Sequence, residues 1–495
     1  MSGLPILTLL VLLPLAGGLC LLSLARRPGI VRMVAVAFAL LEALLAGACW
    51  LASSSPRPPG APQGFFLFAD VPWIDALGIR YTLGMDGISL LLVLLTALVT
   101  VLAMLVSWRS IHERVSLHFA LLLVMESGIM GVFLALDLFV FYLFWEVMLI
   151  PMFFLIGIWG HGRHIYSAIK FFLYTLFGSL LMLLAIIGLY LLHGAHSGSY
   201  SFALTALIGT PLAPTTGLWL YAAFLLAFAI KFPLVPLHTW LPDAHTDAPT
   251  AGSVILAGLL LKTGAYGLIR FGYPLFPEAA RTLTPVVLTV AVTGILYGSW
   301  LAFSQKDMKR LVAYSSVGHM GFVALGIAAW TPVALSGAIL QMVSHGLTTS
   351  ALFALVGVLD ERAHTREIGA FGGLWGKMPL FSAFFLLFSM ASAGLPGLNN
   401  FVGEFLILTG TVQVAPLATV LAFIGVILPL VYTVRLVQKV LFEEEGRPLA
   451  LADLGRRELA VFGTLAAGAL VVGLHPLPLL DMLQVPVALL TGGMP

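Results

Sequence analysis

Apolar stretches of about 20 residues recur along this chain from Leu4 to Leu489. Each is long enough to cross a hydrocarbon core of about 30 Å as an α-helix. None shows the alternation of apolar and polar residues that a membrane β-barrel requires. Because lipid offers no hydrogen bonds to the backbone, the sequence predicts an all-α polytopic membrane protein. Only 9% of the residues are charged, against about 25% in soluble proteins.

Fourteen membrane-crossing segments are predicted, with both ends of the chain on the same side. The connection 52–83 is rich in proline and is expected to be an ordered external loop or an interfacial segment. The predicted spans are 3–24, 28–51, 84–107, 117–135, 138–158, 167–192, 218–241, 251–272, 283–303, 309–329, 333–358, 379–412, 417–441 and 459–480.

Lysine and arginine are distributed unevenly between the two sets of connecting loops. Of the 24 basic residues, sixteen lie in loops after odd-numbered spans, with Lys309 among them. Four lie in loops after even-numbered spans, namely Arg57, Arg80, Arg270 and Arg281. Since positively charged loops stay in the cytoplasm, the first set is predicted to be cytoplasmic and both termini are predicted to lie outside.

Motifs for cofactor binding are missing from the sequence. Cys20 and Cys49 are far apart and have no histidine at ligand spacing, so an iron–sulfur or zinc site on this chain is not expected. There is no dinucleotide fingerprint, no P-loop and no nucleophile elbow. The net charge of +2 gives no support for a nucleic-acid partner. The segment 3–24 lacks the features of a signal peptide and is predicted to be a retained helix.

Titratable residues inside the apolar spans are the most informative feature. A charge at the centre of a spanning helix costs about 2.5 to 3.5 kcal/mol, so such residues must be paired, hydrated or neutralised. They are Glu42, Glu126, Glu146, Lys170, Lys231, Lys262, Glu404 and Arg435, together with His319 and His345.

Two pairs of these residues are separated by the same interval. Glu146 precedes Lys231 by 85 residues, and His319 precedes Glu404 by 85 residues. Lys231 is followed by Pro233 and Pro236, and Glu404 follows the sequence GLPG, so each of the two helices is predicted to be broken.

Broken helices at matching positions are typical of transporters built from inverted repeats. The sequence therefore predicts two inverted five-helix repeats, 117–272 and 283–441. The predicted regions 1–116 and 442–495 flank them.

Seven sequence stretches resemble the proton-translocating module shared by the antiporter-like subunits of respiratory complex I, membrane-bound hydrogenases and multisubunit sodium/proton antiporters. The likeness covers residues 84 to 442. The glutamate at position 404 is typical of the M-type subunits that the chain resembles, since the other antiporter-like subunits of complex I generally have lysine at this site. The stretches are FWEVMLIPMFFLI at 144–156, AIKFPLVPLHTWLPDAH at 229–245, APTAGS at 248–253, LLLKTGAYG at 259–267, KRLVAYSSVGHMG at 309–321, Ser344-His-Gly, and GLPG at 394–397 with FVGEF at 401–405.

The resemblance implies roles for six residues in proton translocation. Glu146 is expected to pair with Lys231, while Lys262 and His319 continue a hydrated path. His345 is expected to link this path to Glu404 at the exit to the outside. Burial favours a neutral lysine and a nearby carboxylate favours the charged form. Lys231 could therefore bind a proton when a carboxylate is near and release it when the carboxylate moves away.

The resemblance also implies the setting of the chain. It would be a proton-pumping subunit in a bacterial inner membrane, with no cofactor of its own and with both termini on the periplasmic side. Flavin mononucleotide, iron–sulfur clusters and quinone reduction would belong to other subunits. Neighbouring L-type and N-type antiporter-like subunits would be its partners.

Structural roles remain open for each of these residues. Glu146 and Lys231 could be an ion pair that fixes packing, and Lys262 could extend to an interface. The histidines could be packing residues, and Glu404 could cap a half-helix. Secondary candidates are Glu126, Lys170, Asp137 as an N-cap, and His238, Asp243 and His245, which could line a cytoplasmic proton entrance or form turns.

Two other functions also remain open. The chain could belong to a cation/proton antiporter or membrane-bound hydrogenase, or it could be an inert membrane scaffold.

Overall fold

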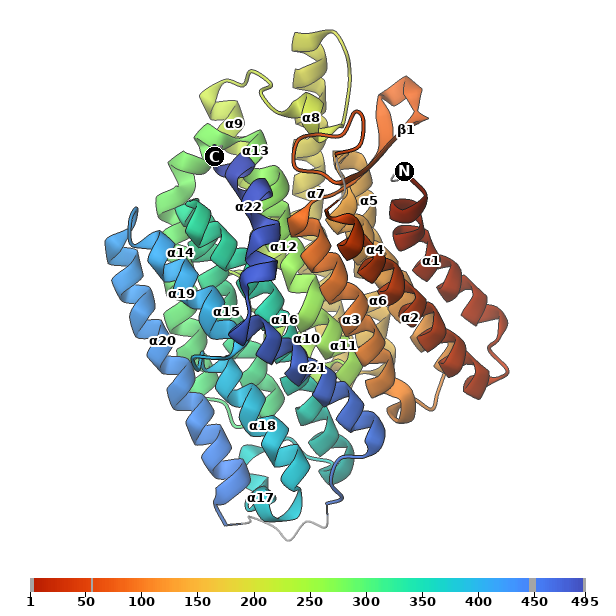
Figure 1. Ribbon diagram of the computed structural model, residues 1–495, viewed down its shortest axis with the longest axis vertical. Coiled ribbons are helices and arrows are strands. Elements are labelled where there is room, and N and C mark those ends of the chain that lie inside the picture. Colours follow the sequence, from red (N-terminus) through yellow and green to blue (C-terminus); the bar gives the residue numbers. More distant parts are fainter. Residues whose placement is uncertain (1–3, 55–56, 445–450, 493–495) are drawn as a thin grey trace.

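The computed structural model describes residues 4–54, 57–444 and 451–492, and Figure 1 shows their arrangement as a bundle of helices. The N-terminal region contains α1 (Leu4–Ser23), α2 (Pro28–Ala52), β1 (Leu67–Ile74), the 3-10 helix η1 (Asp75–Leu77), β2 (Ile79–Met85) and α3 (Gly87–Ser110).

The middle region contains two π-helical segments, η2 and η3, within one span. Its elements are α4 (Val115–Leu134), α5 (Leu138–Val147), α6 (Leu149–Trp159), α7 (His164–Ser197), α8 (Leu204–Leu207), α9 (Pro214–Lys231), α10 (Trp240–Asp247), α11 (Thr250–Ile255), η2 (Leu256–Leu260), α12 (Leu261–Gly267), η3 (Leu268–Gly272) and α13 (Tyr273–Leu275).

The C-terminal region ends in two helices separated at Pro476. Its elements are α14 (Pro277–Phe303), α15 (Met308–Ala329), α16 (Pro332–Ala363), the 3-10 helix η4 (Ile368–Ala370), α17 (Leu374–Lys377), α18 (Pro379–Ser392), α19 (Asn399–Thr411), α20 (Pro416–Val437), the π-helix η5 (Gln438–Phe442), α21 (Arg456–Leu474) and α22 (Leu477–Thr491).

The predicted spans agree with the helices, apart from the last one. In the described residues, thirteen helical segments are long and apolar enough to cross a membrane. The predicted span 379–412 is the fourteenth, and it consists of the shorter helices α18 and α19. The prediction 459–480 is wrong at its end, because α21 stops at Leu474 and a new helix starts at Leu477, next to Pro476.

The loop 52–83 contains a β-hairpin that the sequence analysis did not predict. Strands β1 and β2 pair antiparallel, and Arg80 binds Asp70 across the pair with an N–O distance of 2.7 Å. The hairpin also joins the bundle, since the amide of Leu136 donates to the carbonyl of Thr82 at 2.9 Å. The expectation of an ordered segment is therefore confirmed, while the strands were missed because Pro72 argues against pairing.

The helices differ strongly in how much of their surface is buried. Every residue is buried along an 18-residue stretch of Thr250–Leu275 and of Pro332–Ala363, and 94% are buried along such a stretch of Met308–Ala329, against only 28% in Pro28–Ala52. In Figure 1, α1 and α2 lie on one flank and α14 and α20 on the other, with α12, α15 and α16 between them. Since a lipid-facing helix exposes apolar side chains, the three buried spans form the interior of the protein.

Both predicted helix breaks are present. Between α9 and α10 the helix is interrupted at 232–239, where Pro233 and Pro236 lie. Between α18 and α19 it is interrupted at 393–398, where Gly394 and Gly397 adopt φ angles of +75° and +92°. These left-handed conformations are open to glycine and disfavoured for other residues, so GLPG specifies the second break.

Gly264 in α12 lies against the end of α9, where the first break begins. A Cβ atom at this position would lie 2.8 Å from the carbonyl oxygen of Phe228 and 2.8 Å from the Cβ of Phe232. We expect Gly264→Ala to destabilise the protein by about 1 to 3 kcal/mol, because the backbone of α9 must move. A thermal denaturation curve of the purified protein in its complex measures this effect.

Gly47 in α2 provides the matched control. A Cβ atom there would meet no atom within 4 Å, so Gly47→Ala should leave the denaturation midpoint unchanged or raise it. Equal midpoints for Gly264→Ala and the native protein would show that α12 and α9 are not packed as closely as described.

Candidate functional site

Lys262 lies at the centre of the bundle and is fully buried. Its helix α12 is flanked by the π-helical segments η2 and η3, which change the direction of backbone carbonyl groups and often occur at functional sites. The ammonium group of Lys262 donates to the carbonyl of Ala257 in η2, and it lies 2.7 Å from Nδ1 of His345. A buried lysine is thus held in direct contact with a buried histidine.

His345 and His319 continue the row towards Glu404. The two imidazole ring centroids are 5.7 Å apart. Nδ1 of His319 donates to Oε1 of Glu404 at 2.9 Å, and the amide of Gln341 donates to the same oxygen at 3.0 Å. The other ring nitrogen of His319 lies 3.2 Å from the hydroxyl of Ser392 at the end of α18, beside the second helix break.

The order of the two histidines differs from the expected order. The family resemblance implies that His345 links to Glu404, but His319 forms that contact and His345 contacts Lys262. The position of a histidine along its helix does not tell which neighbouring helix it faces. That depends on the packing of α15 and α16 in the tertiary structure.

Glu146 and Lys231 lie near each other without a direct contact. Lys231 is the last residue of α9, and Glu146 lies close enough to interact with it electrostatically. Among the described residues, neither the ammonium group of Lys231 nor Oε1 of Glu146 has a hydrogen-bond partner. Instead, the ammonium group lies 5.6 Å from the ring centroid of Trp145 and 5.5 Å from that of Phe171. The expected ion pair is therefore not formed in this conformation.

The helix that carries Glu146 is also interrupted. Helix α5 ends at Val147 and α6 begins at Leu149, two residues before Pro151. A proline within the first turns of a helix cannot donate a backbone hydrogen bond to the turn before it. The interruption therefore lies at Met148, two residues after Glu146, whereas the first break begins directly after Lys231.

Two of the secondary candidates form an ion pair at one end of the row. Lys170 binds Asp243 at 2.7 Å, and Arg310 approaches the same carboxylate at 3.5 Å. The side chain of Lys170 is 20% exposed and that of Asp243 is 12% exposed, so water reaches this pair. His238 packs edge-on against Tyr297 and belongs to the interrupted segment 232–239.

His245 lies nearer to the row than the sequence suggested. Its side chain is fully buried and stacks on Phe353, with ring centroids 4.6 Å apart. Neither ring nitrogen has a hydrogen-bond partner in the described part of the chain. It interacts electrostatically with both Lys262 and His345, so it extends the row away from Glu404.

Asp137 and Glu126 lie outside the row. Asp137 is the N-cap of α5, as predicted, and accepts from the amides of Phe139 at 2.9 Å and Val140 at 3.2 Å. Burial raises the pKa of its carboxyl to about 6. Glu126 in α4 lies near Glu42 in α2, away from the row.

Two buried cations were assigned to loops by the sequence analysis, and the structure corrects both. Arg270 lies in η3 and binds Asp86, the N-cap of α3, at 2.6 Å. Lys309 lies in the first turn of α15 and donates to the carbonyl of Ala248. Each residue stands at the end of a predicted span and was therefore counted with the adjoining loop, whereas tertiary packing buries it.

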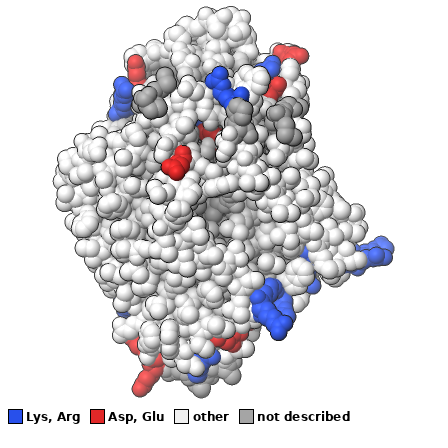
Figure 2. Space-filling view, viewed as in Figure 1, with Lys and Arg blue, Asp and Glu red and all other residues white. Residues whose placement is uncertain are grey.

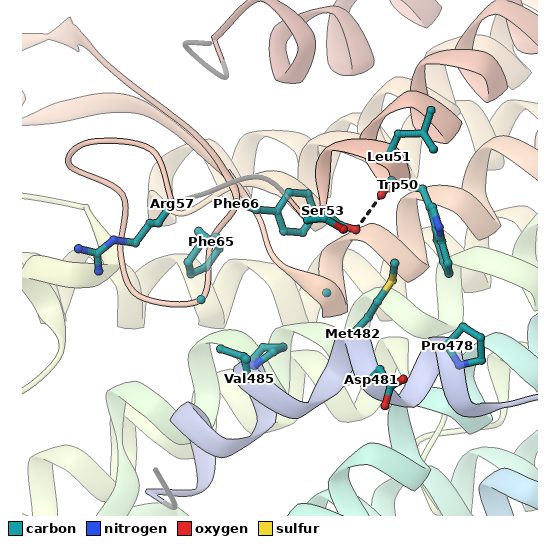
Figure 3. Close-up of a pocket in the computed structure, with 14 residues that line it drawn as sticks. Trp50, Leu51, Ser53, Arg57, Phe65, Phe66, Pro478, Asp481, Met482 and Val485 are labelled. Carbon is teal, nitrogen blue, oxygen red and sulfur yellow. Dashed lines mark hydrogen bonds between the residues drawn. The ribbon is translucent and has the colours of Figure 1, made fainter. Parts of the chain in front are cut away.

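A surface cavity of about 620 Å³ lies where the end of α2 meets α22, away from the row. Figure 3 shows Arg57, Phe65 and Asp481 around it. None of the residues of the row lines this cavity, so its size does not mark it as the functional site.

Paired broken helices around a buried row of lysine, histidine and glutamate define the class of antiporter-like ion-translocating membrane subunits. Comparisons with known proteins agree with this class. A family profile described as NADH:quinone oxidoreductase/Mrp antiporter, TM, matches residues 135–429. NADH-quinone oxidoreductase subunit M of Pseudomonas aeruginosa is 45% identical over 487 residues, covering 96% of each chain. The chain therefore belongs to the NADH:quinone oxidoreductase/Mrp antiporter family and, within it, to the subunit M proteins.

Chains in two solved complexes have the same fold as this chain. A chain in respiratory complex I from Thermus thermophilus is 35% identical, with a TM-score of 0.88, and the match covers 98% of this chain and 100% of that one. A chain in the Mrp complex from Dietzia sp. is 22% identical, with a TM-score of 0.87, covering 98% and 97%, and this likeness concerns the fold alone. The chain is accordingly a multi-pass protein of the bacterial inner membrane.

Proposed function

We propose that this chain is the proton-translocating M-type membrane subunit of NADH:quinone oxidoreductase. The observation that carries the proposal is the buried row Lys262, His345, His319 and Glu404, in which Lys262 contacts His345 and His319 contacts Glu404. The names of the curated relatives at 42 to 45% identity support the same function. The redox chemistry, with flavin mononucleotide, iron–sulfur clusters and quinone, belongs to other subunits in this proposal.

The chemistry of the row suits proton transfer. The ammonium group of Lys262 can pass a proton to Nδ1 of His345, because the two nitrogens are in hydrogen-bonding contact. His319 can release a proton from Nδ1 to Glu404 while it takes up another at Nε2, where the hydroxyl of Ser392 lies. An imidazole can act in this way because either nitrogen can hold a proton.

Glu146 and Lys231 are proposed to regulate entry to the row. Without a hydrogen bond between them, a small movement at the interruptions beside both residues could form or break their contact. Contact with the carboxylate would favour the charged lysine, and separation would favour the neutral one. Lys170, Asp243 and His245 are proposed to connect this region with the cytoplasm.

The proposed orientation places both termini on the periplasmic side. In Figure 1 the two ends of the described chain lie towards the same end of the bundle. Figure 2 shows that the charged side chains on the viewed face gather towards the two ends, with uncharged residues between them. The excess of basic residues in the loops after odd-numbered spans supports a cytoplasmic location for those loops.

The two inverted repeats and the neighbours remain part of the proposal. Each of the units 117–272 and 283–441 contains one of the two predicted helix breaks, and each of these breaks adjoins one of the two pairs separated by 85 residues. L-type and N-type antiporter-like subunits are the proposed neighbours in the membrane arm.

Purification of the native complex tests this function against a cation/proton antiporter. We expect a complex that contains flavin and iron–sulfur clusters, that reduces quinone with NADH, and that acidifies the vesicle interior without a need for sodium. A complex without redox subunits that exchanges sodium for protons would contradict the proposal. Absorption spectra, NADH oxidation and a pH-sensitive dye provide the measurements.

A further inference from the structure

A cavity with three cationic side chains lies between α14 and α20, at the end of the bundle that carries the loop after α14. Its volume is about 490 Å³, and Lys306, Arg435 and Lys439 line it together with Trp300. None of the three cations forms an ion pair with a carboxylate in the described part of the chain. Glu367 also lines the cavity and is exposed, so the lining still has an excess of two positive charges.

Two of the three cationic residues lie on the same side of this cavity. Arg435 and Lys439 are four residues apart at the junction of α20 and η5, so they lie on the same helix face. The guanidinium group of Arg435 lies 4.8 Å from the ring centroid of Phe303, which holds it beside the last turn of α14. Such a group of unpaired cations between helices attracts an anion.

An apolar groove continues from this cavity between the same two helices. It has a volume of about 680 Å³ and is lined by residues of α14 from Leu288 to Trp300 and of α20 from Leu417 to Leu428. Trp300 lines both the cavity and the groove. Figure 1 shows α14 and α20 adjacent on the flank of the bundle.

The groove has the apolar lining and the length expected of a binding site for a hydrocarbon chain. The hydroxyls of Thr289 and Thr293 donate to backbone carbonyls of α14, at 2.8 and 2.7 Å, so they offer no hydrogen to an occupant. From Leu288 to Trp300 the helix rises roughly 18 Å at about 1.5 Å per residue, close to half the thickness of the hydrocarbon core. Tyr297 and Trp300 are exposed near its charged end, as aromatic side chains are at membrane interfaces.

We propose that this two-part groove binds an anionic phospholipid, with its phosphate among Lys306, Arg435 and Lys439 and an acyl chain along α14 and α20. A neighbouring apolar helix could cover the groove, but it would leave the three cations without a counter-charge. A phospholipid fits both the cavity and the groove, because its phosphate supplies the counter-charge and its acyl chain covers the apolar residues. The site lies on the flank of the bundle and uses none of the residues assigned to proton transfer.

Photo-cross-linking of the purified complex in vesicles tests the proposal. The probe is phosphatidylglycerol with a diazirine in its acyl chain, and the comparison probe is phosphatidylcholine with the same chain. We expect phosphatidylglycerol to label peptides of 288–300 and 417–428 about tenfold more than phosphatidylcholine does, because only its headgroup carries a net negative charge. Mass spectrometry of the digested complex identifies the labelled peptides.

Substitution of the cations provides the second part of the test. Arg435→Gln with Lys439→Gln should reduce labelling by phosphatidylglycerol by about tenfold and leave labelling by phosphatidylcholine unchanged. Arg26→Gln with Arg27→Gln, at the exposed turn between α1 and α2, is the matched control and should leave both unchanged. NADH oxidation by each variant confirms that the complex is assembled.

Three results would overturn the proposal. Equal labelling by the two lipids would show that the cations do not select a headgroup. Displacement of the probe by inorganic phosphate would show a site for free anions. Cross-links from residues of the groove to another subunit, with no lipid label, would show that protein covers it.

Discussion

Replacing Lys262 with alanine is expected to reduce proton pumping by the complex by about a hundredfold or more, because loss of a proton-transfer group has effects of this order. Lys262 is the one lysine in contact with a histidine of the row, and its removal leaves Nδ1 of His345 and the carbonyl of Ala257 without their donor. No other basic side chain among the described residues hydrogen-bonds to His345. The measurement is acidification of vesicles during NADH oxidation.

Lys377→Ala in α17 is the control for this substitution, since it removes an exposed lysine at one end of the bundle. It should assemble and pump as the native protein does. Both variants should be present in the membrane in equal amounts, measured by immunoblot of the purified complex. Undiminished pumping by the Lys262→Ala complex would rule out the row as the path of the protons.

Replacing Arg270 with methionine is expected to destabilise the protein by about 3 to 5 kcal/mol, because it leaves the carboxylate of Asp86 buried without a counter-charge. The two side chains are 5% and 1% exposed, and the N–O distance is 2.6 Å. The same carboxylate caps α3 by accepting from the amide of Ser89 at 2.9 Å. Thermal denaturation of the complex and its yield after detergent extraction provide the measurements.

A double substitution separates the charge effect from a packing effect. Asp86→Asn keeps a capping side chain, so Asp86→Asn with Arg270→Met should recover a large part of the lost stability. The pair Arg80 and Asp70 is the exposed control, with side chains 37% and 33% exposed, and Arg80→Met should cost less than about 1 kcal/mol. Equal losses from Arg270→Met and Arg80→Met would show that burial of the first pair does not matter.

The positions of the helix breaks and caps could be predicted because they depend on nearby residues. Pro233 and Pro236, which stand close together, and the sequence GLPG interrupt their helices, because a proline lacks a backbone donor and glycine adopts positive φ angles. Asp137 caps α5 through amides two and three residues away. The β-hairpin was missed although its strands are close in sequence, because Pro72 argues against strand pairing.

The titratable residues of the row, Lys262, His319, His345 and Glu404, could be identified from the sequence alone, since an apolar span of about 20 residues places its central side chains within the membrane whatever the fold. Which of them touch was decided by the tertiary structure. The rotation of α15 and α16 brings His319 to Glu404 and His345 to Lys262, and the tertiary fold places Arg270 in η3 beside Asp86, the buried N-cap of α3. Helix rotation and packing depend on contacts between distant segments, which no local pattern of residues contains.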